Sequence, residues 1–378
     1  MERCSERCFW WFKNKSIIDR LIVFVDTFLE FIVLFILLCF LSFIPTKKNR
    51  DINIVFSSVG LLLFLFAAFR DGDYIDSRGV QLSDYDVYIS YFNHYQDALV
   101  EPTFKWISQI IHSFDGGYIF LFCIYAFLGL YCKFLAISKL STLVLSSVLV
   151  YVSRFFMLHE MTQIRIGVAS GLVLLSYIYI YEKNIKKFLF FVLIATMFHV
   201  SALLVIPFYY FNCHSINKRL YGFLIPLSYV FYFTGIKVIS LLKLLPINFI
   251  QAKIDTYLEL QEIGDSVASD INVFNWVHIV QCIIAYLLLN KVGEIAKYNS
   301  YAYLLIKIYI YALAFYVFFA TFPVLAGRGK ELFLIVEIIV IPWLTYLFKP
   351  RMIAKSIVVA YAIIIMGIVV FYDKIIPI

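Results

Sequence analysis

The sequence lacks the features by which small secreted domains and zinc proteins are recognised. Its seven cysteines form no CxxC pair and no Cys/His spacing of a zinc site, so we expect neither a metal centre nor a disulfide framework. It has no low-complexity tract and no internal repeat at a period of about 20–50 residues. The first long apolar block has no small-residue cleavage pattern, so no cleavable signal peptide is expected.

Apolar residues make up most of the chain. They account for 63% of the 378 residues, against about 45–50% in soluble domains, and the mean hydropathy is +0.88. The excess falls in blocks of roughly 17–25 residues, the length that crosses a hydrocarbon core. The blocks are continuous in Leu, Ile, Val and Phe, which predicts helices rather than alternating barrel strands. The net charge of +7 is attributed to loop Lys and Arg near the inner membrane surface, and no nucleic-acid partner is expected.

The predicted fold is all-α, a polytopic transmembrane helix bundle of about 10–12 spans in a single integral membrane domain, residues 1–378. The candidate spans are Leu21–Ile44, Ile52–Phe69, Tyr118–Ala136, Thr142–Met157, Ile166–Tyr181, Phe188–Phe211, Leu220–Phe233, Ile236–Ile247, Phe274–Asn290, Tyr301–Thr321, Leu332–Phe348 and Ile353–Tyr372. One of them, Ile236–Ile247, is too short to cross alone.

The distribution of Lys and Arg over the short loops predicts the orientation. One set of alternate loops holds 13 basic residues and the other holds 6, so the first set is predicted to be cytoplasmic. The first set includes Lys133, and the second includes Lys218 and Arg219. Two long loops, residues 70–117 and 248–273, are then periplasmic. The first twenty residues are also basic, although this parity places them outside, and the charge rule does not explain them.

The long loop 70–117 is predicted to carry two short amphipathic helices at the outer membrane interface. Ser83, with Asp86 three residues on, resembles a capping box that opens the first helix. Pro102 suits the first position of the second helix. One face of the first helix carries Tyr85, Tyr88, Phe92 and Tyr95.

Three arginines near the outward ends of spans are candidate anion ligands: Arg70, Arg165 and Arg328. A guanidinium group binds phosphate oxygens in a bidentate manner, so three that converge would suit a lipid diphosphate. The alternative for each is an interfacial side chain, or the partner of a nearby carboxylate. For Arg165 the functional interpretation is favoured, because this residue ends a polar patch that contains His159 and Gln163.

His199 lies among apolar residues, in MFHVSAL. A histidine in such a setting is more often a hydrogen-bond partner between helices than a catalyst. Both interpretations stay open at this point.

Three runs at the end of the second span and in loop 70–117 resemble the signature of the EpsG family of polysaccharide polymerases. FRDGDY ends the second span with an Arg, and SDYDVYISYF carries an Asp-Tyr-x-x-Tyr-x-x-x-Phe pattern, followed by EPTFKWISQII. The matching residues are Arg70, Asp84, Tyr85, Tyr88, Phe92, Glu101, Pro102 and Phe104. Leu82 stands where the family has Gly, so the turn that this glycine makes is unsupported here.

Three later runs extend the resemblance over nearly the whole chain, except its first twenty residues. QIRIGVASGLVLLS resembles the start of a family helix and places Arg165. MFHVSALLVIP resembles the His-x-Ser-Ala element and places His199 and Ser201. GRGKELFL resembles the late Arg element and places Arg328.

The resemblance implies a Wzy-type O-antigen or capsule polymerase, a glycosyltransferase of lipopolysaccharide biosynthesis. Such an enzyme is a multi-pass protein of the bacterial inner (cytoplasmic) membrane, with its active site facing the periplasm. It moves a growing glycan from undecaprenyl pyrophosphate onto a lipid-linked repeat unit. The expected partners are undecaprenyl-pyrophosphate-linked oligosaccharide, membrane lipid, and the chain-length regulator and flippase of the pathway. No cofactor and no metal are expected.

Within this expectation, Arg165, Arg70 and Arg328 meet the charge of the leaving diphosphate. Asp84 is the first candidate for the base that deprotonates the attacking hydroxyl, His199 the second, and Glu160 and His159 follow. The remaining substrate-binding candidates are Tyr85, Tyr88 and Gln163, of which the two tyrosines are expected to pack against sugar faces.

Three other function classes remain open from the sequence. An O-antigen ligase-like transferase would share the arginine-rich outward site. A lipid-linked oligosaccharide flippase would favour charged residues through mid-membrane. A membrane-bound O-acyltransferase would need a His base on the acyl-donor side, for which His159 or His199 gives little support.

Overall fold

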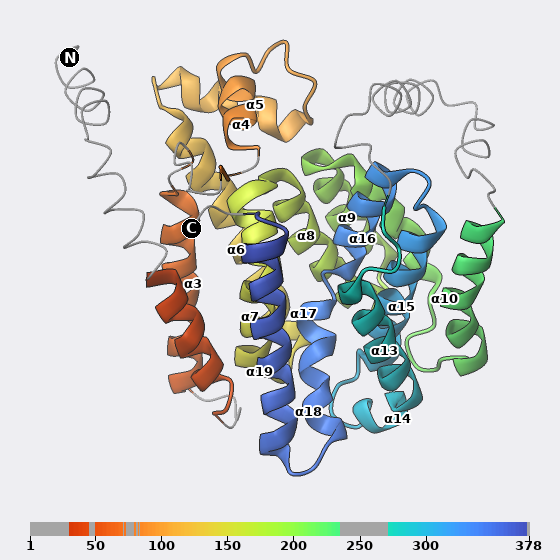
Figure 1. Cartoon of the computed structure of the whole chain (residues 1–378). Helices are drawn as coiled ribbons and strands as arrows, with labels where there is room; N and C mark the ends of the chain where they lie inside the picture. The colour runs from red at the N-terminus through yellow and green to blue at the C-terminus, as the bar shows by residue number, and fades with distance from the viewer. Residues whose placement is uncertain are drawn as a thin grey trace.

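The computed structural model describes residues 30–44, 50–70, 72, 79–80, 82, 84–234 and 271–375. Within these ranges the regular elements are helices and none is a strand, so the predicted all-α class is confirmed (Figure 1). Predictions about the first twenty residues, Ile236–Ile247 and nearly all of loop 248–273 lie outside the described residues.

In the part of the chain that the structure describes, five helical stretches are long and apolar enough to cross a membrane. They are α3 (Arg50–Ala68), α6 (Tyr118–Leu140), α7 (Val144–Val150) continuing into η1 (Tyr151–Thr162), α8 (Ile164–Tyr181), and α19 (Arg351–Gly367) continuing into η5 (Ile368–Tyr372). Shorter apolar helices are Glu30–Leu41, η2 (Val200–Tyr210), α13 (Trp276–Asn290) and α15 (Ala302–Phe318). Apart from η2, each of these helices corresponds to one predicted apolar block, because a backbone in the hydrocarbon core must satisfy its own hydrogen bonds.

The remaining helices complete the bundle and its ends. They are α4 (Tyr85–Asn93), α5 (Pro102–Ser113), α9 (Ile185–Phe198), α10 (Lys218–Phe233), α14 (Val292–Ile295), α16 (Pro323–Leu334), α17 (Glu337–Val340), η4 (Ile341–Trp343) and α18 (Leu344–Leu347). Helices α16 to α18 are successive segments of one interrupted helix. The span predicted there, Leu332–Phe348, begins near the end of α16. Pro342 lies in the break, where it lacks the amide hydrogen of a regular helix.

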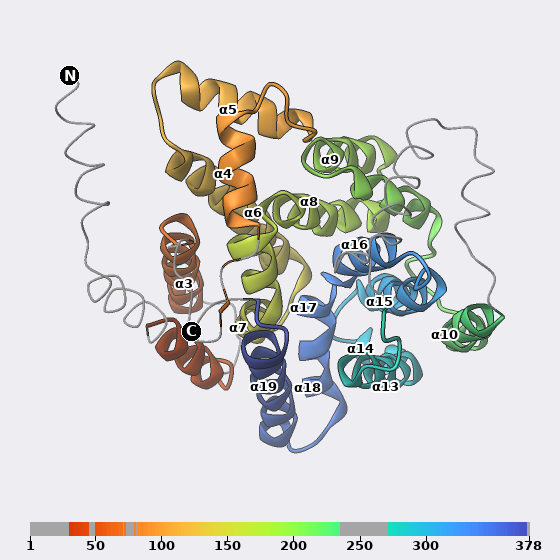
Figure 2. The same cartoon turned by 45° about the horizontal axis from the view of Figure 1, so that its top comes forward.

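Helix α8 is one of the two most buried long helical stretches that the structure describes, together with α7–η1, and it lies at the centre of the half that carries the site. Figure 2 shows it between α6 on one side and α9 and α16 on the other. Small residues allow this close packing: a Cβ added to Gly171 of α8 would lie 2.8 Å from Cβ of Cys132 in α6. The polar groups that α8 presents at its start are therefore held on a rigid element.

The predicted span Phe188–Phe211 is wrong, because the chain reverses at His199. Helix α9 ends there, and His199 is extended, with φ −156° and ψ 120°. Helix η2 then returns beside α9: the hydroxyl of Tyr209 donates to the Lys183 carbonyl at 2.9 Å, and Lys183 Nζ donates to the Phe211 carbonyl at 3.2 Å. The segment is a helical hairpin, which apolar composition alone does not distinguish from one long helix.

This reversal changes which loops share an end of the bundle. Lys218 Nζ donates to the Asn290 carbonyl at 2.7 Å, so Lys218 lies with the basic loop that follows α13. Lys133, in contrast, lies inside α6 with 0% exposure and belongs to no loop. One basic residue thus leaves the predicted cytoplasmic set, while Lys218 and Arg219 join it. The asymmetry of basic residues between the two ends is larger than the sequence predicted.

Helices α4 and α5 cover the opposite end of the bundle, at the top of Figure 1. Helix α5 begins at Pro102, as predicted. The N-cap position of α4 is Asp84, one residue after the predicted cap, and it makes no side-chain capping hydrogen bond. Ser83 itself lies outside the described residues. Three residues of the predicted aromatic face, Tyr85, Tyr88 and Phe92, are the buried residues of α4, whereas Tyr95 lies beyond the end of the helix at Asn93.

Candidate functional site

A π-helix leads the chain into the candidate site. The twelve residues of η1 follow α7 without a break, and Gln163 then turns the chain into α8. π-helical segments are rare, and they occur frequently at functional sites. The turn places Gln163 and Arg165 at the end of the bundle that α4 and α5 cover.

Arg165, in the first turn of α8, joins that helix to the layer above it. Its Nη1 donates to Oε2 of Glu101, the residue that precedes α5. Its guanidinium carbon lies 5.8 Å from the ring centroid of Tyr88 and 6.0 Å from that of Tyr91. The side chain is 21% exposed and its Nε is buried, so Arg165 is partly accessible while its position is fixed.

Arg328 approaches the same turn from α16. Its Nη1 donates to Oε1 of Gln163 and lies 3.8 Å from Oε2 of Glu331. The side chain of Arg328 is 37% exposed, more than that of Arg165. Arg328 therefore combines a fixed position with access from outside the bundle.

Arg70 is held differently from the other two arginines. Its guanidinium carbon lies 3.9 Å from the ring centroid of Phe122, and its Nη1 donates to the Ala67 carbonyl at 2.7 Å and the Glu160 carbonyl at 3.2 Å. Its Nε and Nη2 are buried and bond to no described residue. Burial lowers the pKa of Arg70 to about 10, so the group stays cationic at neutral pH. Its bond to the Glu160 carbonyl ties Arg70 to the end of η1.

The charged groups of the site converge on Tyr88. Burial raises the pKa of the Tyr88 hydroxyl, the positive charges of Arg165 and Arg328 oppose that shift, and the negative charge of Asp84 adds to it. Arg70 is also within electrostatic range of Tyr88. Residues that the sequence places far apart are therefore neighbours.

The predicted aromatic ligands are covered by protein in this structure. Tyr85 is 6% exposed and Tyr88 is 4% exposed. The ring of Tyr85 stacks on Phe122 with centroids 5.0 Å apart, and Tyr88 packs near Phe104 at 6.0 Å. Each ring also lies near an arginine: the Tyr85 centroid is 5.9 Å from the guanidinium carbon of Arg70, and that of Tyr88 is 5.8 Å from the guanidinium carbon of Arg165. Their contact with sugars stays a prediction.

His199 lies at the apex of the α9–η2 hairpin. Its Nδ1 is 2.7 Å from the Ser201 hydroxyl and accepts from the Ser201 amide at 3.4 Å, which caps η2. The hydroxyl of Thr103, in α5, donates to the Met197 carbonyl at 2.6 Å. The apex is thus packed under α5, at the same end of the bundle as Arg165, and the ring of His199 has a structural role in the turn.

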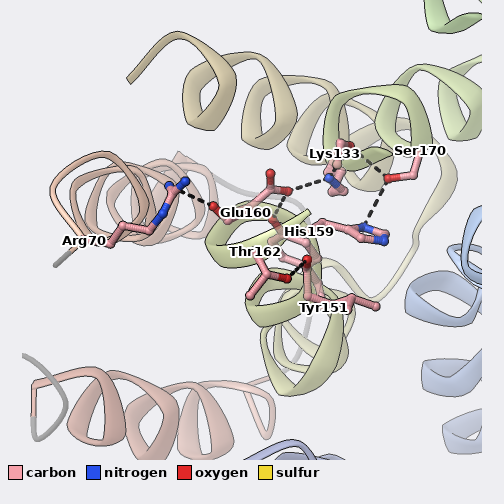
Figure 3. A network of polar contacts seen from close by, with 9 residues as sticks. Arg70, Lys133, Tyr151, His159, Glu160, Thr162 and Ser170 are labelled. Carbon is pink, nitrogen blue, oxygen red and sulfur yellow. Dashed lines mark hydrogen bonds and ion pairs between the residues drawn. The ribbon is translucent and has the colours of Figure 1, made fainter. Parts of the chain in front are cut away.

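Glu160 and His159 are enclosed in a buried polar network that also includes Arg70, drawn in Figure 3. Oε1 of Glu160 accepts from Lys133 Nζ at 2.5 Å and from the Tyr151 hydroxyl at 2.7 Å. Nδ1 of His159 lies 3.2 Å from the Ser170 hydroxyl, and His159 is 0% exposed. Glu160 is engaged by a cation and a hydroxyl, so it fixes the end of η1 and is unsuited to accept a substrate proton.

Sequence reasoning missed three residues that organise this region. Glu101 was visible only as a motif position, although it pairs with Arg165. Lys133 could have been found as a lone lysine within a predicted apolar span. Glu331 follows Arg328 by one helical turn, a spacing that a search for i, i+3 pairs would have shown. Among the described residues, no three His, Cys, Asp or Glu side chains are grouped to hold a metal ion.

The fold and this site define a helical integral membrane protein with a cationic cluster at one end of its bundle. The chain belongs to the EpsG family, whose model matches residues 53–377. Membership indicates a membrane glycosyltransferase of polymerase-like function. No curated protein and no solved structure matches the chain.

Proposed function

We propose that this protein is a Wzy-type polysaccharide polymerase. It transfers a growing glycan from undecaprenyl pyrophosphate onto a lipid-linked repeat unit at the periplasmic face of the bacterial inner membrane. The observation that supports this most directly is that Arg328 bonds to Gln163, two residues before Arg165, and that the positive charges of both arginines act on Tyr88, at one end of the bundle. Two guanidinium groups at a membrane end suit the headgroup of a lipid diphosphate.

The orientation follows from the charge of the two ends. The loops at the end opposite α4 and α5 hold most of the basic loop residues, including Lys183, Lys218 and Lys291. Such loops face the cytoplasm. The arginine cluster then faces the periplasm, where lipid-linked glycans are joined in this scheme.

The chemistry requires charge stabilisation on the leaving group. The acceptor hydroxyl attacks the anomeric carbon of the donor sugar, and the bond from that carbon to the diphosphate oxygen breaks. Negative charge develops on this oxygen, and fixed cations aimed at it are the largest available catalytic contribution. Arg165 and Arg328 supply these cations, and Arg70 holds the turn that carries one of them.

The test is complementation of a strain that lacks this protein. Loss of the protein should reduce its surface polysaccharide to single repeat units on a gel, and the native gene should restore the ladder. Arg165→Ala should fail to restore it, since removal of one charge-stabilising donor costs about 100- to 1,000-fold in rate. Arg219→Ala, an exposed arginine at the opposite end, is the matched control and should restore the ladder.

Each variant must be present in the membrane at the native level, as judged by immunoblotting. A full ladder from Arg165→Ala would overturn the role of this residue. Long glycan chains that stay on their lipid carrier in the deletion strain would indicate a ligase-like transferase instead.

A further inference from the structure

Glu331 of α16 lies one helical turn after Arg328 and has no assigned role. Its side chain is 20% exposed, and its Oε2 is 3.8 Å from Arg328 Nη1, beyond hydrogen-bonding distance. This oxygen is buried and accepts no hydrogen bond from the residues that the structure describes. A carboxylate in this condition keeps its ability to accept a proton.

Two other described glutamates near this end of the bundle are already engaged. Glu101 accepts from Arg165, and Glu160 accepts from Lys133 and Tyr151. Direct bonds to cations and hydroxyls stabilise the ionised form of a carboxylate and weaken it as a base. Among these glutamates, Glu331 alone keeps a buried oxygen free beside an arginine of the site.

The surroundings of Glu331 contain charges of both signs. Burial raises the pKa of its carboxyl group above the ordinary value. Arg328, Arg154 and Lys330 oppose this shift, and Asp84, which precedes α4, adds to it. A buried carboxyl with a raised pKa is the usual form of a catalytic glutamate.

We propose that Glu331 is the general base of the glycosyl transfer, placed one helical turn from the arginine that meets the leaving diphosphate. This inference rests on the proposed function and deepens it. Glu331 takes the proton of the acceptor hydroxyl as the hydroxyl oxygen bonds to the anomeric carbon of the donor sugar. The electron pair of the broken carbon–oxygen bond leaves with the undecaprenyl diphosphate, beside Arg328. Glu331 releases the proton to water after the product departs.

This assignment replaces Asp84 as the first candidate for the base. Asp84 holds the N-cap position of α4 in the left-handed region, with φ 63°. Its negative charge acts on Glu331 from outside α16. The role of Asp84 is therefore electrostatic: its negative charge helps to keep the pKa of the Glu331 carboxyl group raised.

The experiment measures kcat of the purified full-length protein against pH, with a lipid-diphosphate glycan as donor and a lipid-linked repeat unit as acceptor. A base acts when deprotonated, so the native kcat should fall as pH falls through the pKa of Glu331. Glu331→Gln should lower kcat roughly 100- to 10,000-fold and remove this acid limb. Its affinity for inorganic pyrophosphate and its melting temperature should stay near native values, which shows that the site is intact.

Charge changes around Glu331 should move the acid limb in opposite directions. Asp84→Asn removes a negative charge and should shift the limb to lower pH. Lys330→Met removes a positive charge and should shift it to higher pH. A merely structural role of Glu331 predicts neither shift.

Two results would overturn the assignment of Glu331 as the base and leave the proposed function intact. One is a native kcat in Glu331→Gln. The other is an acid limb that is lost in Asp84→Asn but retained in Glu331→Gln. If Glu331→Gln does not fold, Glu331→Asp decides, since a shortened base should lower kcat and keep the limb, while unchanged kcat contradicts the role. If the native protein transfers no glycan between these substrates, the proposed function itself is wrong.

Discussion

The Nη1 atom of Arg328 donates a hydrogen bond to Oε1 of Gln163, and this bond joins residues 165 positions apart in the chain. It links α16 to the turn between η1 and α8. Arg165, two residues after Gln163, is fixed in turn by Glu101. The two arginines of the proposed diphosphate site are therefore positioned by one short segment.

Substitution of Gln163 should weaken this positioning. Gln163→Ala removes a hydrogen bond to a charged group, which contributes about 1.5–3 kcal/mol. We expect roughly a tenfold or larger loss of kcat/KM for the donor, because about 1.4 kcal/mol corresponds to tenfold. Gln163→Glu keeps an acceptor but balances the charge of Arg328, so its affinity for pyrophosphate should fall further. Steady-state kinetics measures the loss in Gln163→Ala, and calorimetric titration with pyrophosphate measures the affinity of Gln163→Glu. Native affinity in Gln163→Glu would contradict the assignment.

Substitution of Arg70 should lower the stability of the fold, even when the positive charge is kept, because its contacts need the planar guanidinium group. Its guanidinium carbon lies over the ring of Phe122, 3.9 Å from the centroid, while Nη1 donates to two backbone carbonyls. Arg70→Lys keeps the charge but loses the forked donor and the stacked contact. We expect it to lower stability by about 1–3 kcal/mol, seen as a lower melting temperature in detergent. Equal melting of the native and Arg70→Lys proteins would show that these contacts are dispensable.

The helical class and the helix positions could be predicted from the sequence, because a lipid environment demands long apolar helices. The placement of Arg165 and Arg328 at the same end of the bundle was also predictable, since the alternation of the predicted spans puts both on the same side of the membrane. The reversal at His199 was not, because apolar residues fill both arms of the hairpin equally. The pairing of Lys133 with Glu160 was not, since it depends on how α6 packs against η1. The π-helix has no pattern that distinguishes it from the α-helix before it.

The buried pair of Lys133 and Glu160 should stabilise the fold strongly. Lys133 Nζ donates to Glu160 at 2.5 Å and to the Gly167 carbonyl at 2.6 Å, with both side chains of the pair at most 1% exposed. Lys133→Met leaves a buried carboxylate without a counter-charge, which costs about 3–5 kcal/mol. The melting temperature in detergent, compared with that of the native protein, measures the loss.

Two variants sharpen this prediction. Glu160→Gln combined with Lys133→Met removes both charges and should recover part of the stability lost by Lys133→Met alone. Lys291→Met breaks the exposed pair with Glu294, at 2.7 Å, and should leave melting unchanged. If the double variant melted below Lys133→Met, the uncompensated charge would not be the cause of the loss.

The hairpin at His199 predicts which loops face the same side of the membrane. Lys186, at the start of α9, and Ser215, after η2, should be accessible from one side, since the chain enters and leaves at the same end. A single span over Phe188–Phe211 would place them on opposite sides. Leu99, fully exposed between α4 and α5, should be accessible from the other side.

Single cysteines at these three positions, in a background without native cysteine, can be labelled with an impermeant maleimide. In intact spheroplasts, Leu99→Cys should react, while Lys186→Cys and Ser215→Cys should react only after the membrane is permeabilised. The hairpin predicts that Lys186 and Ser215 lie on the same side of the membrane, and the charge rule predicts which side that is. The labelling pattern tests the two predictions separately. Labelling of Lys186→Cys and Ser215→Cys from opposite sides would contradict the hairpin, whereas labelling of both in intact spheroplasts would keep it and invert the orientation, moving the arginine cluster to the cytoplasmic face.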